Sequence, residues 1–126
     1  MTAPDQYASV RYLVEDVDEA VDFYTTHLGF RLLTHPAPPF ADVVRGPLRL
    51  LLSGPASSGA RATPEHAASP GRNRIHLVVD DFDDLITRLR DAGLSFASDV
   101  VAGPGGRQIL LLDPAGNLVE LFEPAT

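Results

Sequence analysis

The chain opens on an alternating hydrophobic pattern and continues with a helical one. Positions 9–14 alternate between residues of different chemical character, which predicts a strand with two unlike faces. From 17 to 28 the apolar residues recur three or four positions apart, which predicts a helix. Asp16 or Asp18 can cap the start of this helix, and Gly29 can end it.

The same pattern recurs 65 positions later. The segment SVRYLVEDVDEAV, which starts at Ser9, aligns with RIHLVVDDFDDLI, which starts at Arg74, and the alignment places Asp81 opposite Asp16. The second segment also runs through a helical pattern to a glycine, Gly93. Because a sequence repeat normally folds as one supersecondary unit, we expect two copies of the same motif.

Three short strands are predicted after each helix, separated by turns rich in glycine and proline. They cover 30–35, 40–44 and 48–53 in the first half, and 95–100, 108–112 and 117–122 in the second. The pattern predicts an α+β fold with two tandem βαβββ modules.

We expect residues 1–126 to form a single domain, with one module at 8–53 and the other at 73–124. The segment 54–72 is dominated by Ala, Ser, Gly and Pro, so it cannot contribute a core of its own. A loop of this length between modules is either a linker or a lid.

Composition narrows the classes of function. The chain has no cysteine, which excludes disulfides and thiolate chemistry. Its net charge of −7 disfavours a nucleic-acid partner, and no apolar run approaches the roughly 20 residues of a membrane span. The N-terminus shows no secretion signal, so we expect a cytoplasmic protein that handles a small molecule.

Two segments carry a family resemblance: VEDVDEAVDFYTTHLGF (14–30) and LLDPAGNLVELFEP (111–124). With the duplicated βαβββ plan, they make the chain similar to the vicinal oxygen chelate superfamily, which includes glyoxalases, bleomycin-resistance proteins, fosfomycin-modifying enzymes and extradiol dioxygenases. The resemblance implies a cupped mixed sheet with the helices on its outer face. It does not fix the function, because this superfamily contains both enzymes and pure binders.

In the metal-dependent members, a histidine usually opens the first strand of each module and a carboxylate lies late in the last strand. Mapped onto this chain, the histidine positions carry Ser9 and Arg74, and the carboxylate positions carry Glu120 and either Leu50 or Leu51. An arginine keeps its positive charge, which opposes a bound cation. The resemblance therefore predicts no metal and no other cofactor.

His76 and Glu120 each allow two interpretations. A displaced metal site could use both residues, although no third ligand is evident; alternatively, His76 is a pocket-wall residue that hydrogen-bonds a ligand or a carboxylate. Glu120 is either a general base or part of a structural network with Arg11 or Arg74, because a carboxylate on an apolar face needs a partner.

The residues expected to line the cup combine an apolar surface with a few polar groups, as a ligand site requires. They could instead pack against one another and fill the cup. They are Ser9, Arg11, Leu13, Phe40, Leu50, Leu52, Arg74, His76, Val78, Leu118, Glu120 and Phe122.

These observations favour a metal-independent binding protein that sequesters a hydrophobic or aromatic antibiotic or metabolite, similar to the bleomycin-resistance branch. The alternative is a lyase, isomerase or dioxygenase of the glyoxalase type, either metal-dependent or using His76 and Glu120 for acid–base chemistry. No nucleophile motif is present, and we expect binding in preference to catalysis. The resemblance also implies a homodimer.

Overall fold

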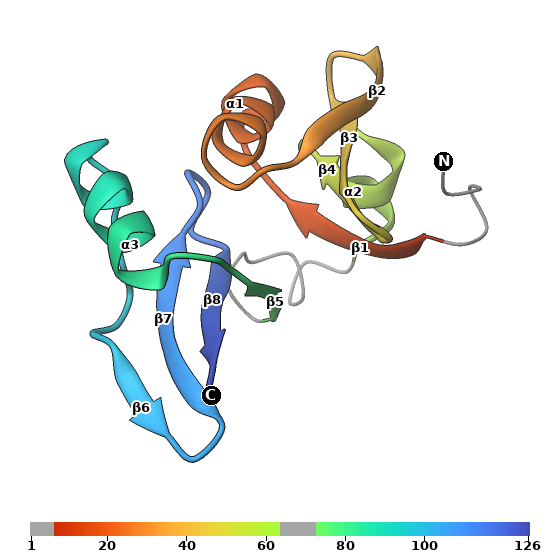
Figure 1. Ribbon diagram of the computed structural model, residues 1–126. Coiled ribbons are helices and arrows are strands. Elements are labelled where there is room, and N and C mark those ends of the chain that lie inside the picture. Colours follow the sequence, from red (N-terminus) through yellow and green to blue (C-terminus); the bar gives the residue numbers. More distant parts are fainter. Residues whose placement is uncertain (1–6, 64–72) are drawn as a thin grey trace. The chain divides into compact units, whose positions relative to one another are not determined.

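The computed structural model describes residues 7–63 and 73–126. The chain divides into two compact units, Met1–Pro70 (unit 1) and Gly71–Thr126 (unit 2). Each unit contains its own four-stranded sheet (Figure 1).

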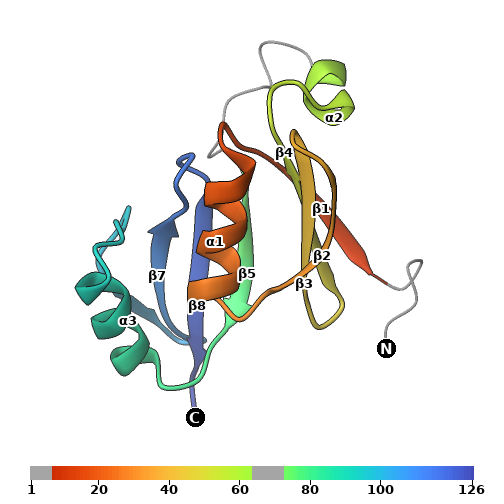
Figure 2. The same cartoon turned by 90° about the horizontal axis from the view of Figure 1, so that it is seen from above.

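Unit 1 is a βαβββ module followed by a short helix. Its strand order is β1-β4-β3-β2, in which β1 runs parallel to β4 and the other neighbours are antiparallel (Figure 2). Its elements are β1 (Ala8–Leu13), α1 (Val17–His27), β2 (Arg31–Ala37), β3 (Phe40–Arg45), β4 (Leu48–Ser53) and α2 (Ser58–Ala62).

Unit 2 repeats this topology, with strand order β5-β8-β7-β6 and β5 parallel to β8. Its elements are β5 (Arg74–Val78), α3 (Phe82–Asp91), β6 (Val101–Gly103), β7 (Gly106–Leu112) and β8 (Leu118–Pro124). The predicted α+β fold with two βαβββ modules is confirmed.

The core of unit 1 lies between α1 and one face of the sheet. Leu50 and Leu52 of β4 pair in register with Val10 and Tyr12 of β1, and Leu50, Leu52 and Tyr12 are buried. Tyr24 of α1 is also fully buried, and α1 packs on β2, β3 and β4. Burial of these apolar side chains is the main stabilising contribution in this unit.

The register corrects one prediction. Leu50 and Leu52 were expected to line the ligand cup, but they lie on the helix-covered face of the sheet. Leu51 pairs with Arg11 on the opposite face, which we call the open face of unit 1. Leu51 is therefore the counterpart of Glu120, because it pairs with Arg11 as Glu120 pairs with His76. This is the second of the two registers considered from the sequence.

Unit 2 buries the corresponding face of its sheet under α3. The buried apolar strand residues alternate with the residues of the other face, which we call the open face of unit 2. Arg107 joins the sheet to α3 by hydrogen bonds to Asp83 and Glu123, and its guanidinium lies 4.9 Å from the ring centroid of Phe82. Asp83 and then Glu123 raise the pKa of Arg107 above its ordinary value. The buried apolar residues of unit 2 are Ile75, Leu77, Phe82, Ile86, Leu89, Ile109, Leu111, Val119 and Leu121.

The two main helices begin differently despite the aligned aspartates. The carboxylate of Asp16 accepts a hydrogen bond from the backbone N–H of Glu19 at 3.0 Å, so it caps α1 as predicted. Asp81 adopts left-handed backbone angles and makes no side-chain cap on α3. The duplication is thus preserved in topology and not in every local contact.

Two segments differ in detail from the sequence-based expectation. Part of the predicted linker forms α2, whose start is capped by Ser57, while 64–72 lies outside the described residues. The strand expected at 95–100 appears instead as β6, and Phe96 forms only an isolated bridge with Leu111. The Ser98 hydroxyl accepts a hydrogen bond from the Leu110 backbone N–H, which replaces part of the regular strand pairing. Among the described helices, none is both long and apolar enough to cross a membrane.

Candidate functional site

The open face of unit 2 brings together six of the residues predicted to contact a ligand. Since β5 and β8 pair in parallel register, His76 lies opposite Glu120, and Val78 lies opposite Phe122. Arg74 lies opposite Leu118 at the start of both strands. Their position on one face is a consequence of the two-residue period of a strand.

Glu120 is the centre of this cluster. Its Oε1 accepts a hydrogen bond from Arg74 Nε at 2.9 Å, and its Oε2 lies 3.4 Å from His76 Nε2. The Glu120 side chain is only 10% exposed, so its charge requires compensation from a partner. Arg74, one of the two partners considered from the sequence, provides that compensation, and both carboxylate oxygens are engaged.

The partners of Glu120 are far more accessible than the carboxylate itself. The side chains of Arg74 and His76 are 43% and 49% exposed. The His76 ring lies 4.7 Å from the Phe122 ring between centroids, with the planes inclined by 41°. This face therefore presents the guanidinium of Arg74, the imidazole of His76 and the ring of Phe122 to solvent.

The residues at the family's metal-ligand positions do not fit a metal ion. Arg74 stands at one position and is already bonded to Glu120 at another, while Ser9 and Leu51 stand at the remaining two. No group of three or more His, Asp or Glu side chains that could hold a metal occurs in the part of the chain that the structure describes. His76 and Glu120 are adjacent, as a displaced site would require, but these residues supply only two ligands.

The open face of unit 1 has different chemistry at the equivalent positions. Arg11, which corresponds to His76 in the duplication, donates a hydrogen bond from Nη1 to Ser53 Oγ at 2.7 Å. Its guanidinium lies where a side chain on Gly59 of α2 would otherwise project. Leu51 replaces the carboxylate of Glu120. Of the remaining predicted residues, Ser9 is exposed, and Leu13 and Phe40 are partly buried.

Sequence reasoning missed a buried carboxylate on the open face of unit 1, Asp42. Asp42 is 1% exposed and forms an ion pair with Arg49, whose Nη2 lies 2.7 Å from Oδ2. The Thr34 backbone N–H also donates to Asp42 Oδ1 at 2.8 Å. An aspartate in the centre of the apolar run FADVV was the signal that could have identified it.

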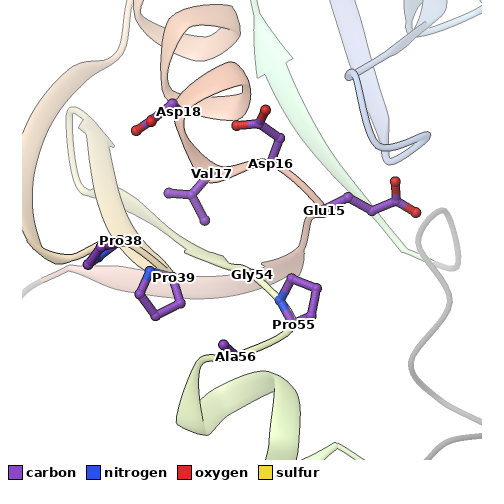
Figure 3. A pocket seen from close by; sticks show the side chains of 9 residues that line it. All are labelled: Glu15, Asp16, Val17, Asp18, Pro38, Pro39, Gly54, Pro55 and Ala56. Carbon is purple, nitrogen blue, oxygen red and sulfur yellow. The ribbon is translucent and has the colours of Figure 1, made fainter.

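A hollow of about 460 Å³ lies at the start of α1 (Figure 3). Two of its three carboxylates have structural partners, because Asp16 caps α1 and Asp18 Oδ1 lies 3.7 Å from His35 Nε2. None of the residues predicted to bind a ligand lines it. The lining consists of Glu15, Asp16, Val17, Asp18, Pro38, Pro39, Gly54, Pro55 and Ala56.

The fold and residues 6–121 match the family described as the Glyoxalase/Bleomycin resistance protein/Dioxygenase superfamily. The chain belongs to this superfamily.

Several solved structures resemble the chain over nearly its full length. TnmS3, an antibiotic binding protein from Streptomyces sp. CB03234, is 27% identical, with a TM-score of 0.74 and coverage of 99% of this chain and 100% of that one. A superfamily member from Sphaerobacter thermophilus DSM 20745 is 28% identical, with a TM-score of 0.72 and coverage of 93% and 95%. A lactoylglutathione lyase from Agrobacterium tumefaciens is 24% identical, with a TM-score of 0.75 and coverage of 97% and 96%, and shows likeness of fold alone. No protein of curated function matches the sequence significantly.

Proposed function

We propose that this protein binds a hydrophobic or aromatic small molecule, such as an antibiotic or a metabolite, without a metal and holds it by sequestration. The observation that carries the proposal is the ion pair between Arg74 and Glu120. It occupies two positions where metal-dependent relatives place ligands, and it neutralises the one carboxylate available there.

The open face of unit 2 has the composition that such binding requires. Val78 is exposed, and Leu118 and Phe122 are partly exposed beside the polar cluster. Complete burial of one large apolar side chain contributes about 1.5–3 kcal/mol, so a ligand that covers these residues gains substantial affinity. Arg74 and His76 provide polar groups at fixed places for orientation.

TnmS3 supports an antibiotic as the class of ligand, because it is described as an antibiotic binding protein and aligns over nearly the whole chain.

The same superfamily contains enzymes, and one contact favours an enzymatic function as the second candidate. His76 Nε2 lies 3.4 Å from Glu120 Oε2, a geometry that a cofactor-free lyase or isomerase could use for proton transfer.

Calorimetric titration of demetallated protein with Mn²⁺, Ni²⁺, Zn²⁺ and anaerobic Fe²⁺ tests the metal-free proposal. We expect no stoichiometric binding, because Arg74 places a permanent positive charge beside Glu120. The same demetallated protein is then screened by thermal shift against antibiotics and aromatic metabolites. A ligand present at 100 times its Kd adds about 2.7 kcal/mol to the free energy of unfolding, which raises Tm measurably.

Tight metal binding that disappears in Glu120→Ala would contradict this proposal. Turnover of a carbonyl or epoxide substrate that is lost in both His76→Ala and Glu120→Gln would replace it with the enzymatic alternative. Stabilisation by an aromatic compound that is recovered chemically unchanged would support sequestration.

We also propose that the protein forms a homodimer. The resemblance implies this assembly, and exposed apolar residues lie on the outer strands of both sheets. Leu32 and Leu33 lie on β2, and Val101 lies on β6.

A further inference from the structure

We infer that the open face of unit 2 selects planar ligands that carry an anionic oxygen group, such as aryl carboxylates, over equivalent cations. This inference rests on the proposed binding function and identifies the chemical class of its ligand. This preference depends on which charges at the cluster remain accessible.

The negative charge of the cluster is concealed. Glu120 is 10% exposed, and its two oxygens face Arg74 Nε and His76 Nε2. A cationic ligand would have to displace one of these partners to reach the carboxylate. Such an exchange is disfavoured because it must first break the hydrogen-bonded ion pair that Arg74 already forms with Glu120.

The positive charge of the cluster is available. Arg74 uses Nε to bond Glu120, and among residues 7–63 and 73–126 the structure gives its guanidinium no other partner. The other N–H groups of the guanidinium are accessible to a ligand, because the Arg74 side chain is 43% exposed. A guanidinium fork matches the geometry of a carboxylate, which makes such bonds stronger than those between neutral groups.

The adjacent aromatic surface suits the ring of the same ligand. His76 and Phe122 form an inclined pair with centroids 4.7 Å apart, and exposed Val78 lies opposite Phe122 in the strand register. A planar ring can pack on this surface while its anionic group reaches Arg74 on the same face. Aromatic pairs of this type contribute about 0.5–1.5 kcal/mol beyond the area that they bury.

The overall charge of −7 would suggest the opposite preference, since it attracts cations at long range. Salt decides between the two effects. At physiological ionic strength the Debye length is about 8 Å, so distant exposed carboxylates are screened, whereas a direct contact with Arg74 is not. The local charges therefore determine which ligand is retained.

The test compares three ligands with the same ring system: naphthalene-2-carboxylate, naphthalene-2-methanol and 2-naphthylmethylammonium. Their Kd values are measured calorimetrically with demetallated full-length protein in physiological salt. We expect the carboxylate to bind about tenfold or more tightly than the other two, because it forms a charge-assisted hydrogen bond. Arg74→Gln should abolish this preference, and Arg74→Lys should retain part of it.

Glu120→Gln provides a test of opposite sign. The amide can still accept the bond from Arg74 Nε, but the neutralising charge is removed, so the ratio of carboxylate to ammonium affinity should rise severalfold. Arg88→Gln is the matched control, because Arg88 is an exposed arginine of α3, which covers the other face of the sheet. It removes the same charge and should leave the preference unchanged.

The inference is overturned if the ammonium ligand binds as tightly as the carboxylate, if Arg74→Gln preserves the preference, or if Glu120→Gln lowers the ratio. Equal binding of all three ligands would overturn it while leaving the proposed binding function intact. Failure of all three to bind at millimolar concentration would also overturn it. The metal titration and the thermal-shift screen then decide separately whether the proposed function stands.

Discussion

Two buried carboxylates on the open faces of the sheets have different surroundings. Asp42 is bonded to Arg49 and to the Thr34 backbone, and all these groups belong to unit 1. Glu120 is held by Arg74 and His76, whose outer parts remain exposed. We therefore expect Asp42 to contribute to stability, whereas the Glu120 cluster is the site proposed for binding.

Asp42→Ala should lower the free energy of unfolding by about 3 kcal/mol, because it leaves Arg49 and the Thr34 N–H without their buried partner. Urea denaturation followed by circular dichroism measures this change. Asp22→Ala is the control, because Asp22 is exposed on α1, and its effect should remain within about 0.5 kcal/mol. Equal effects of the two substitutions would show that the Asp42 network contributes nothing to stability.

At the residue scale, the sequence indicated Arg11 and Arg74 as possible partners of Glu120, because a carboxylate on an apolar face needs to be neutralised. It did not establish the phase of β4. In β4 three consecutive leucines, 50–52, make both faces apolar, so alternation gives no phase. The flanking polar residues Arg49 and Ser53 share a face with Leu51 and could have indicated the correct register.

At the scale of elements, prediction was most accurate where a long periodic segment was bounded by a cap or a glycine, as in α1. It was less accurate where a segment depends on contacts distant in sequence. β6 is three residues long and is defined by pairing with β7, which no local pattern reveals. The α2 sequence SGARA is too short and too weakly apolar to show a helical period.

The β6–β7 turn offers a test at this scale. Gly106 has φ of +144°, and a Cβ there would collide with the backbone carbonyl oxygen of Glu123. Gly106→Ala should therefore lower the free energy of unfolding by about 2 kcal/mol or more. Thermal denaturation of Gly106→Ala and Gly103→Ala measures the difference.

Gly103 is the matched control because a Cβ there has no neighbour within 4 Å. Its substitution should change the free energy of unfolding by no more than about 0.5 kcal/mol. If Gly106→Ala were as stable as Gly103→Ala, the tight approach between the start of β7 and the end of β8 would not exist in solution.

At the scale of the whole molecule, the repeat in the sequence was sufficient to predict two modules with the same strand order. The same alignment showed that the modules have diverged in chemistry, because Glu120 in one corresponds to Leu50 or Leu51 in the other. The strand register identifies Leu51 as the counterpart of Glu120. The cup that the resemblance attributes to both modules together remains a prediction. The assembly of two chains can be tested directly.

Sedimentation velocity at micromolar concentration should give twice the 13.5 kDa mass of one chain. The physical reason is the exposed apolar surface on the outer strands β2 and β6, which association would remove from water. A monomer across the micromolar range would reject the proposed dimer. Because that result concerns assembly alone, the binding proposal for unit 2 would still be decided by the ligand titrations.

The buried aromatic residues of unit 1 have a spectroscopic consequence. The chain contains three tyrosines and no tryptophan, and Tyr7, Tyr12 and Tyr24 all belong to unit 1. Intrinsic fluorescence therefore reports the melting of that half, whereas far-ultraviolet dichroism reports the backbone of both. The two transitions coincide if the halves unfold in one cooperative step, so the native chain carries its own optical reporter of whether its duplicated modules are thermodynamically coupled.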